Sequence, residues 1–521
     1  MNIEHVEKSY QELESDSTLQ NLIAQANARY ILYNTEESKE NFPRYTIKDE
    51  QLNILAFKYL NIGCNYFSEH NYLKASHSLE KGALILEYIH GSIHIQTKNK
   101  KLFCLISALS YYVCFQYSKA FILIGKLESD TMISSLVSLF LNRKFDQLLS
   151  EIDKLITNSS YGDEYLAEHF EEDNATKIYE IIIAKSLNYY VQFYQTGNKD
   201  FLEIAKKDLV NLQEVAAMRG EPDVWWVIRL LLLIIDGFKE SSLWYVLGNY
   251  FNTEDKLPLK YIQSLVYKNG SITELFLTQR NSLPKVLNNK QGSIVSIPTS
   301  SGKTRIGEIA ILNCLLNEPK AKILFIAPYR SLAYEIENSF DEIFSNLDVS
   351  VSHLYGGSLF SKLDERIIDE SSVIVATPEK AKALFRSNED ILSCIKLVII
   401  DEGHLLGTDK RLIVNEMFYE ELKYHVKANG GRFLLLSAVL PNAEDLSEWL
   451  TDSTDNVYKE NWRPSDERIG IMEWNGVSVN LNWKSTDAER NSFNPNFIMR
   501  QKLPLALGFP GGQAAGIVRV I

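Results

Sequence analysis

The sequence predicts a multidomain protein in which an all-α, helical-repeat domain is followed by an α/β domain with a parallel sheet. The chain has 521 residues, enough for about two to four domains of ordinary size. From Tyr10 to about Gly248 apolar residues recur at helical spacing and proline is nearly absent. After Pro258, short β-branched runs alternate with helical stretches, the pattern of a parallel sheet covered on both faces.

Composition and charge narrow the possible functions. Hydrophobic residues make up 45% of the chain and charged residues 23%, which excludes a disordered or fibrous protein. The net charge is −13, so any contact with nucleic acid must be local rather than made by a broad basic surface. The five cysteines lack metal-ligand spacing, the first residues show no basic segment followed by an apolar run, and the longest apolar stretch is broken by Arg229. We therefore expect a soluble, cytoplasmic protein without membrane contact.

Residues 1–260 are predicted to form the helical domain. Gly63 and Ala75 would let two antiparallel helices approach closely, with Tyr66 filling the groove between them. This alternation of large and small residues resembles a tetratricopeptide unit. A second copy of the spacing follows at Ala108, Tyr111, Ala120 and Ile124, too far along the chain for a regular array, so we expect an irregular tetratricopeptide-like domain. Two interpretations stay open: a docking surface for a partner protein, or a platform that braces the second domain.

Residues 261–465 are predicted to form the α/β domain, and its first strand leads into a phosphate-binding loop. Five strands are expected, at Ser293–Ile297, Ile323–Ala327, Val373–Ala376, Leu397–Ile400 and Phe433–Ser437. After the first strand come Thr299, Ser300, Ser301, Gly302, Lys303 and Thr304, followed by a helical run. Backbone amides of such a loop can bind phosphate oxygens, while Lys303 reaches the β- and γ-phosphates and Thr304 supplies a hydroxyl to Mg²⁺.

A carboxylate pair follows the fourth predicted strand. Leu397–Ile400 run directly into Asp401, Glu402, Gly403 and His404. A buried carboxylate is costly unless it faces a metal or a partner, so we expect Asp401 to hold Mg²⁺, partly through water. Glu402 would orient or deprotonate an attacking water, and His404 would sense the state of the phosphate. With Lys303, these residues form the predicted catalytic set of an ATP-hydrolysing enzyme.

These motifs and their order resemble the first motor domain of superfamily-two DExH-box helicases, closest to the Ski-like branch. The resemblance covers residues 272–464 and implies a RecA-like, P-loop NTPase fold. It includes a glutamine motif at 276–279, a first motif at 298–304, motif Ia at 327–333, motif Ib at 376–380, motif II at 401–404 and motif III at 437–446.

The resemblance implies further site residues and partners. Gln279 would recognise adenine beside the phosphate loop, so the cofactors would be ATP and Mg²⁺. Single-stranded DNA or RNA would be held along its backbone by Arg330, Ser331, Thr377 and Lys380. Ser437 and Ala438 would couple hydrolysis to strand binding, although Val439 stands where the family usually has threonine.

The tail, residues 466–521, departs from the family. Superfamily-two helicases bind ATP between two motor domains, and the second domain supplies arginine fingers. The tail is too short for such a domain and Gly/Ala-rich from Leu503 onward, so we expect the second motor domain to be incomplete or absent, as in a truncated or frame-shifted product.

Three hypotheses follow. The chain is the N-terminal part of a helicase that hydrolyses ATP weakly by itself, or another chain completes the motor. The third is a helical interaction module whose ATP-binding domain is a regulatory or vestigial switch. The combination of helical extension and motor domain is similar to Hachiman-type helicases of microbial antiviral defence.

Overall fold

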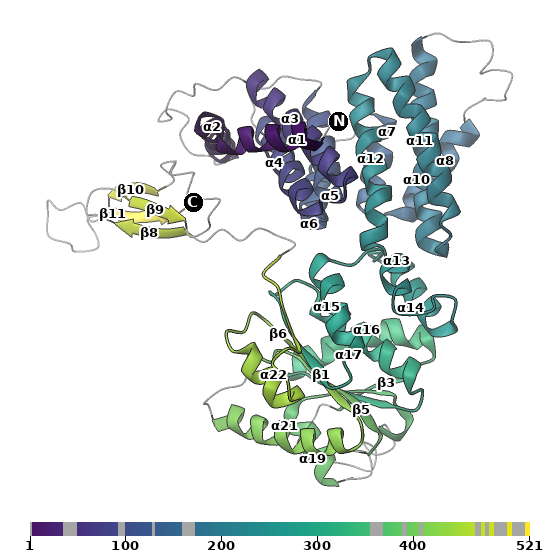
Figure 1. The fold of residues 1–521 in the computed structure, drawn as a ribbon, viewed down its shortest axis with the longest axis vertical. Helices are drawn as coiled ribbons and strands as arrows, with labels where there is room; N and C mark the ends of the chain where they lie inside the picture. The colour runs from purple at the N-terminus through teal and green to yellow at the C-terminus, as the bar shows by residue number, and fades with distance from the viewer. Residues whose placement is uncertain are drawn as a thin grey trace. The chain divides into compact units, whose positions relative to one another are not determined.

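The computed structural model describes residues 3–34, 49–91, 99–127, 131–158, 172–354, 368–387, 393–405, 410–463, 470–474, 479–483, 498–502 and 516–520 (Figure 1). The chain divides into two compact units. The first comprises residues 1–189, 202–235 and 465–521, and the second comprises residues 190–201 and 236–464. The predicted division at residues 260 and 465 stays a prediction.

The described part of the N-terminal half is helical, as predicted. Its helices are α1 (Ile3–Ser15), α2 (Ser17–Asn34), α3 (Asp49–Ser68), α4 (Tyr72–His90), α5 (Asn99–Val113), α6 (Tyr117–Gly125), α7 (Met132–Leu141), α8 (Phe145–Asn158), α10 (Glu172–Thr196), α11 (Asp200–Arg219) and α12 (Pro222–Ser241). None of the helices that the structure describes has the length and apolar character needed to cross a membrane.

Helices α3 and α4 form the close antiparallel pair that the small residues predict. A Cβ atom added to Gly63 would lie 2.5 Å from Leu79 Cγ, and one added to Gly82 would lie 2.8 Å from Leu60 Cγ. Tyr66 is buried, but its hydroxyl donates to Glu7 (2.6 Å) and its ring contacts that of Tyr10, so it packs against α1. The two backbones therefore approach at positions where larger residues would collide.

Three successive helix pairs share one turn geometry. Helices α3, α5 and α7 are each followed by a residue with positive φ: His70 (59°), Phe115 (64°) and Arg143 (57°). The next amide donates to a carbonyl five residues earlier, as in a Schellman turn, in Asn71→Tyr66, Gln116→Tyr111 and Lys144→Leu139. The repeated turn indicates a helical-repeat architecture, while the tetratricopeptide assignment stays a prediction.

The second unit is built on a seven-stranded parallel sheet. Its strands are β1 (Gly292–Ser296), β2 (Lys322–Ile326), β3 (Val351–Leu354), β4 (Val373–Ala376), β5 (Ile395–Ile400), β6 (Arg432–Ser437) and β7 (Val457–Lys459). Their spatial order is β3-β4-β2-β5-β6-β1-β7. The helices are α13 (Leu243–Gly248), α14 (Lys256–Val266), α15 (Leu277–Asn288), α16 (Lys303–Asn317), α17 (Arg330–Phe344), α19 (Pro378–Ser387), α21 (Lys410–Ala428) and α22 (Ala443–Thr451), with a 3₁₀ turn at Ser345–Leu347. This arrangement confirms the predicted RecA-like α/β domain after a helical region.

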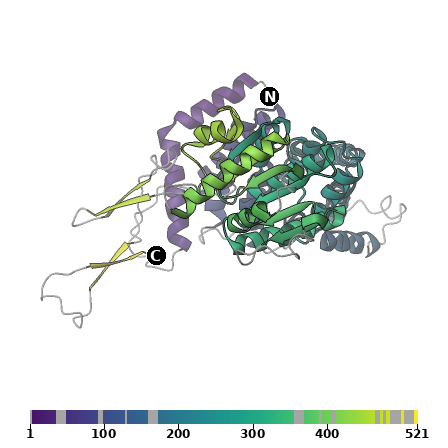
Figure 2. The same ribbon diagram turned by 90° about the horizontal axis from the view of Figure 1, so that it is seen from below.

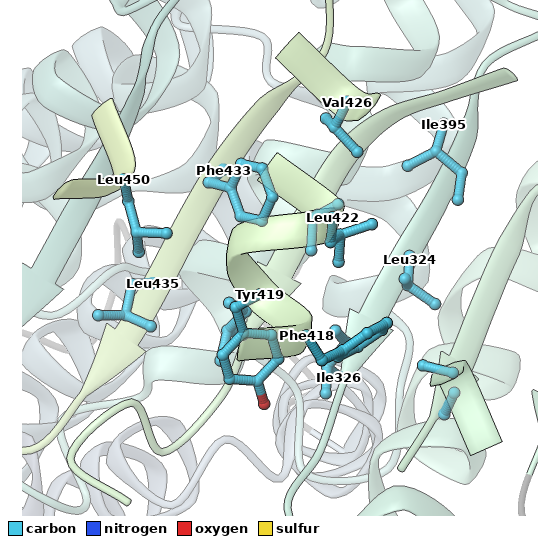
Figure 3. Close-up of a cluster of buried hydrophobic side chains, with 14 of the residues drawn as sticks. Leu324, Ile326, Ile395, Phe418, Tyr419, Leu422, Val426, Phe433, Leu435 and Leu450 are labelled. Atoms are coloured by element: carbon cyan, nitrogen blue, oxygen red, sulfur yellow. The ribbon is translucent and has the colours of Figure 1, made fainter. Parts of the chain in front are cut away.

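Helices cover both faces of this sheet (Figures 1 and 2). On one face, α21 packs Phe418, Tyr419, Leu422 and Val426 against side chains of β2, β5 and β6 (Figure 3). Alternate strand residues point to the other face, where the rings of Phe325 and Phe340, on β2 and α17, lie 5.2 Å apart. Burial on both faces explains why these strands are continuous apolar runs in the sequence.

Within the tail, the structure describes two antiparallel strand pairs. They are β8 (Gly470–Trp474) with β9 (Val479–Trp483), and β10 (Ile498–Lys502) with β11 (Gly516–Val520). The Gly/Ala-rich residues 503–515 lie outside the described residues.

Candidate nucleotide and nucleic-acid site

The predicted site residues gather at one edge of the sheet. All pairs of neighbouring strands in this sheet are parallel, so their carboxyl ends lie at the same edge. The neighbouring strands β5, β6 and β1 lead into Asp401, Ser437 and the phosphate loop. The neighbouring strands β2 and β4 lead into Arg330 and Thr377. The two sets of predicted residues therefore follow two adjacent groups of strands. Both sets lie at the carboxyl edge of the sheet, where open α/β sheets bind ligands.

The phosphate loop has the backbone shape that its sequence predicts. Ser300 and Gly302 have positive φ angles of 66° and 77°, which turn the chain between β1 and α16. A Cβ atom on Gly302 would collide with the side-chain amide of Gln279, so this position requires glycine. Ser301 is fully buried, and its hydroxyl makes no hydrogen bond within the described structure. A loop of this shape at a helix N-terminus fits phosphate oxygens.

The glutamine motif is attached directly to this loop. Gln279 donates from Nε2 to the Gly302 carbonyl (3.0 Å), and its Oε1 accepts from the Phe276 amide (2.8 Å). The neighbouring hydroxyl, that of Thr278, donates to the Ser301 carbonyl (3.4 Å). Helix α15 therefore fixes the position of the loop, although these contacts occupy the polar atoms of Gln279 that adenine recognition would use.

Lys303 and the carboxylates of motif II face one another. Lys303 Nζ lies 3.3 Å from Glu402 Oε2, and His404 Nδ1 lies 3.1 Å from the same carboxylate oxygen. The hydroxyl of Ser437 lies 3.5 Å from His404 Nδ1, which links motif II to motif III. Ala438 follows Ser437 beyond the end of β6. Four predicted residues from three strand ends are thus brought within direct contact.

Asp401 lies at the end of β5 and is only 8% exposed. Burial, and then the charge of Glu402, raise the pKa of Asp401 to about 6, while the Glu402 amide and Lys303 act in the opposite direction. The Asp401 Oδ1 atom accepts the Glu402 amide at 2.9 Å. A buried carboxylate with few hydrogen-bond donors around it is suited to bind a divalent cation. Thr304, in the first turn of α16, has a hydroxyl that would be a second ligand of the same cation.

Ser296 belongs to the site but was missed by the sequence interpretation. Its hydroxyl accepts from the Leu440 amide (2.8 Å) and donates to the Ala438 carbonyl (3.3 Å). The strand that feeds the phosphate loop is thereby tied to motif III. The available signal was a serine at the end of an otherwise buried apolar strand, where a hydroxyl needs a partner.

The predicted nucleic-acid residues differ in exposure. Arg330 and Ser331 are exposed at the start of α17. Thr377 and Lys380 are only 4% and 5% exposed, so their contact with a strand would need a rearrangement and stays a prediction. A small cavity beside these motifs is lined by residues of motifs Ia, Ib and II, including Tyr329, Pro378, Asp401 and Glu402.

The fold and this constellation define a helicase motor domain of superfamily two. Residues 277–446 match the DEAD/DEAH box helicase family, so the chain carries a DEAD/DEAH box helicase domain. The chain is similar to the Hachiman protein HamB of Bacillus cereus, with 41% identity over 500 residues that cover 96% of this chain and 44% of HamB.

Two other comparisons cover the motor region. The ATP-dependent DNA helicase Hel308 of Thermococcus kodakarensis is 33% identical over 218 residues, which are 42% of this chain and 18% of Hel308. The crystal structure of the DUF1998 helicase MrfA bound to DNA matches 38% of this chain and 29% of its own, with 19% identity and a TM-score of 0.34. The chain thus spans less than half the length of these relatives.

Proposed function

We propose that this chain is the N-terminal part of an ATP-dependent helicase or translocase of the DExH type. It binds ATP·Mg²⁺ at the ends of β1 and β5 and one nucleic-acid strand beside the ends of β2 and β4. The observation that carries this proposal is the contact of Lys303 with Glu402, which joins the phosphate loop and the carboxylate pair in one site. Full hydrolysis requires a second motor domain.

Each residue has a proposed role. Lys303 and the amides of the loop from Thr299 to Gly302 bind the phosphates, and Gln279 fixes the loop and borders the adenine. Thr304 and Asp401 hold Mg²⁺, which neutralises phosphate charge when bound. Glu402 orients the attacking water. His404, Ser437 and Ala438 connect this site to the strand-binding motifs, where the exposed Arg330 and Ser331 contact phosphates.

We propose DNA as the strand, because Hel308 is named a DNA helicase. The identity with HamB supports a role of the whole protein in Hachiman-type antiviral defence.

The alternative is a helical-repeat interaction module whose ATP-binding domain is a regulatory or vestigial switch. It is supported by the repeated helix pairs and predicts a partner protein on the helical region, with nucleotide binding but no strand binding.

Equilibrium binding of MgATP tests the nucleotide site. We expect Lys303→Ala to weaken MgATP binding about 10- to 100-fold, because a hydrogen bond to a charged group is lost. The matched control is Lys320→Ala, which removes an exposed lysine just after α16 and should bind like the wild type. Equal affinity of Lys303→Ala and the wild type would overturn the assignment.

Strand binding distinguishes the helicase from the interaction module. Titration with single-stranded DNA and RNA of equal length should give binding that weakens with salt, and Arg330→Ala should reduce the salt slope by about 0.7, the value for one phosphate contact. The Lys320→Ala chain again serves as control. Binding of neither strand would favour the interaction module, and preference for RNA would correct the choice of DNA.

A further inference from the structure

A buried charged cluster lies directly behind the phosphate loop. Glu308 of α16 accepts hydrogen bonds at Oε2 from the Tyr261 hydroxyl (3.1 Å) and from the Arg305 guanidinium. Glu308 is 1% exposed and Tyr261 is fully buried, while the Arg305 side chain is 12% exposed. The cluster joins α16, which carries Lys303 and Thr304, to α14.

Stability alone does not explain this cluster. Burying an ion pair costs several kcal/mol for each ion, and apolar residues of similar volume are often equally or more stabilising. The pair is also incompletely satisfied, because Glu308 Oε1 makes no hydrogen bond within the described structure. Burial is the main cause that raises the pKa of Glu308, against the opposing influence of Arg305 and Tyr261.

The position of the cluster relates it to nucleotide binding. The Arg305 amide donates to the Gly302 carbonyl (3.2 Å), the same carbonyl that accepts from Gln279. On the opposite side of the helix, a Cβ atom on Gly307 would lie 3.5–3.8 Å from side chains of Leu436, Phe325 and Ile399, so this side packs on the sheet. The first turns of α16 are therefore held between the sheet and Tyr261.

We propose that Arg305, Glu308 and Tyr261 are positioning residues that fix the first turn of α16, so that Lys303 and Thr304 meet the triphosphate and its Mg²⁺ together. This inference rests on the proposed ATP site. None of the three touches the nucleotide. They act by fixing the direction of α16, which begins at Lys303. This role explains why an ion pair that packing does not require is buried at this position.

The triple variant Arg305→Met/Glu308→Leu/Tyr261→Phe separates positioning from stability. It removes both charges together with the buried hydroxyl that would otherwise lose its acceptor, and it retains side-chain volume, so the melting temperature should not fall below that of the wild type. MgATP affinity should nevertheless fall about tenfold, the scale of one lost charge-assisted contact. The ratio of the ATP affinity with Mg²⁺ to that with EDTA should also fall below the wild-type ratio, because Thr304 no longer meets the metal that Asp401 holds. A purely structural cluster would leave that ratio unchanged.

The matched control is Lys396→Met/Glu318→Leu, which removes an ion pair of 3.6 Å with a half-exposed carboxylate beyond the far end of α16 and should change neither readout. If the triple variant fails to fold, Tyr261→Phe alone replaces it, with an expected weakening of MgATP binding of about threefold. If the variant that folds binds MgATP with wild-type affinity and wild-type Mg²⁺ dependence, while Lys303→Ala still weakens binding, this inference is overturned and the proposed ATP site stands. Absence of MgATP binding by the wild type would overturn the proposed function itself.

Discussion

Asp401 illustrates a conflict between stability and function at a single residue. Its carboxylate is held at the end of β5, where burial and the neighbouring Glu402 raise its pKa to about 6. The neutral form is therefore favoured in the folded chain, and the associated stability is lost as the pH rises from about 4 to about 6. At neutral pH the charged form is retained at a cost, which a bound cation would offset.

Asp401→Asn should therefore stabilise the nucleotide-free chain at pH 8. The shift of 6 − 3.8 = 2.2 pKa units corresponds to about 3 kcal/mol, so we expect a gain of about 1–3 kcal/mol in the free energy of unfolding. Mg²⁺-dependent ATP binding should be lost in the same variant. Denaturant unfolding measures the gain, with the exposed Asp341→Asn as control. A destabilised Asp401→Asn chain that keeps its Mg²⁺ dependence would contradict this account.

Sequence predicts the charged residues of the site better than the residues that support them. The proximity of Lys303 to Glu402 and Asp401 was predictable, because the loop after β1 and the motif after β5 follow strands of one parallel sheet. The role of the Ser296 hydroxyl was not predictable, because its partners in motif III, Ala438 and Leu440, are more than a hundred residues away in the sequence. The burial of Lys380 was also not predictable, since a motif match does not report exposure.

Helices α3 and α4 depend on a small residue at their contact. Gly63→Ala should destabilise the chain by about 1–3 kcal/mol, because the new methyl group would overlap Leu79 and its backbone. Gly125→Ala is the matched control: no atom lies within 4 Å of its added Cβ, so it should stabilise α6 by up to about 1 kcal/mol. Denaturant unfolding measures both. Equal effects of the two changes would argue against close packing of α3 on α4.

His90, at the end of α4, should make stability depend on pH. Burial, and then Lys100 and Lys126, lower the pKa of His90 to about 4, and its Nε2 makes no hydrogen bond within the described residues. A histidine with a lowered pKa stabilises the fold above pH 6.5, and this contribution is lost as the pH falls toward 4. The shift of 6.5 − 4 = 2.5 pKa units corresponds to about 3 kcal/mol.

The measurement is the free energy of unfolding between pH 4 and 7. His90→Gln should flatten the profile, whereas the exposed His5→Gln should leave it unchanged. A profile that His90→Gln leaves as steep as that of the wild type would show that His90 is not the titrating group.

The central strands of the sheet were predictable to within one or two residues, but its edges and order were not. β1, β2, β4, β5 and β6 are buried and read as apolar runs. β3 and β7 were missed because they are short and lie at the two edges of the sheet. The position of β1 between β6 and β7 depends on long-range pairing, which local sequence does not encode.

The whole molecule combines a helical region with a helicase motor domain whose proposed ATP-binding residues lie at one edge of its sheet. The chain spans 44% of HamB, so the activity of the whole protein is a proposal. Arginine fingers can contribute about 10³–10⁵ in rate, and their expected source is a second motor domain. We therefore expect ATP binding without fast turnover.

The most direct test is ATP hydrolysis by the purified chain, with and without single-stranded DNA, compared with Lys303→Ala at equal protein concentration. We predict that the wild type binds MgATP and turns it over slowly, and that Lys303→Ala weakens binding about 10- to 100-fold and abolishes turnover. Turnover that survives in Lys303→Ala, or a wild-type chain that does not bind MgATP, would contradict the assignment of the site.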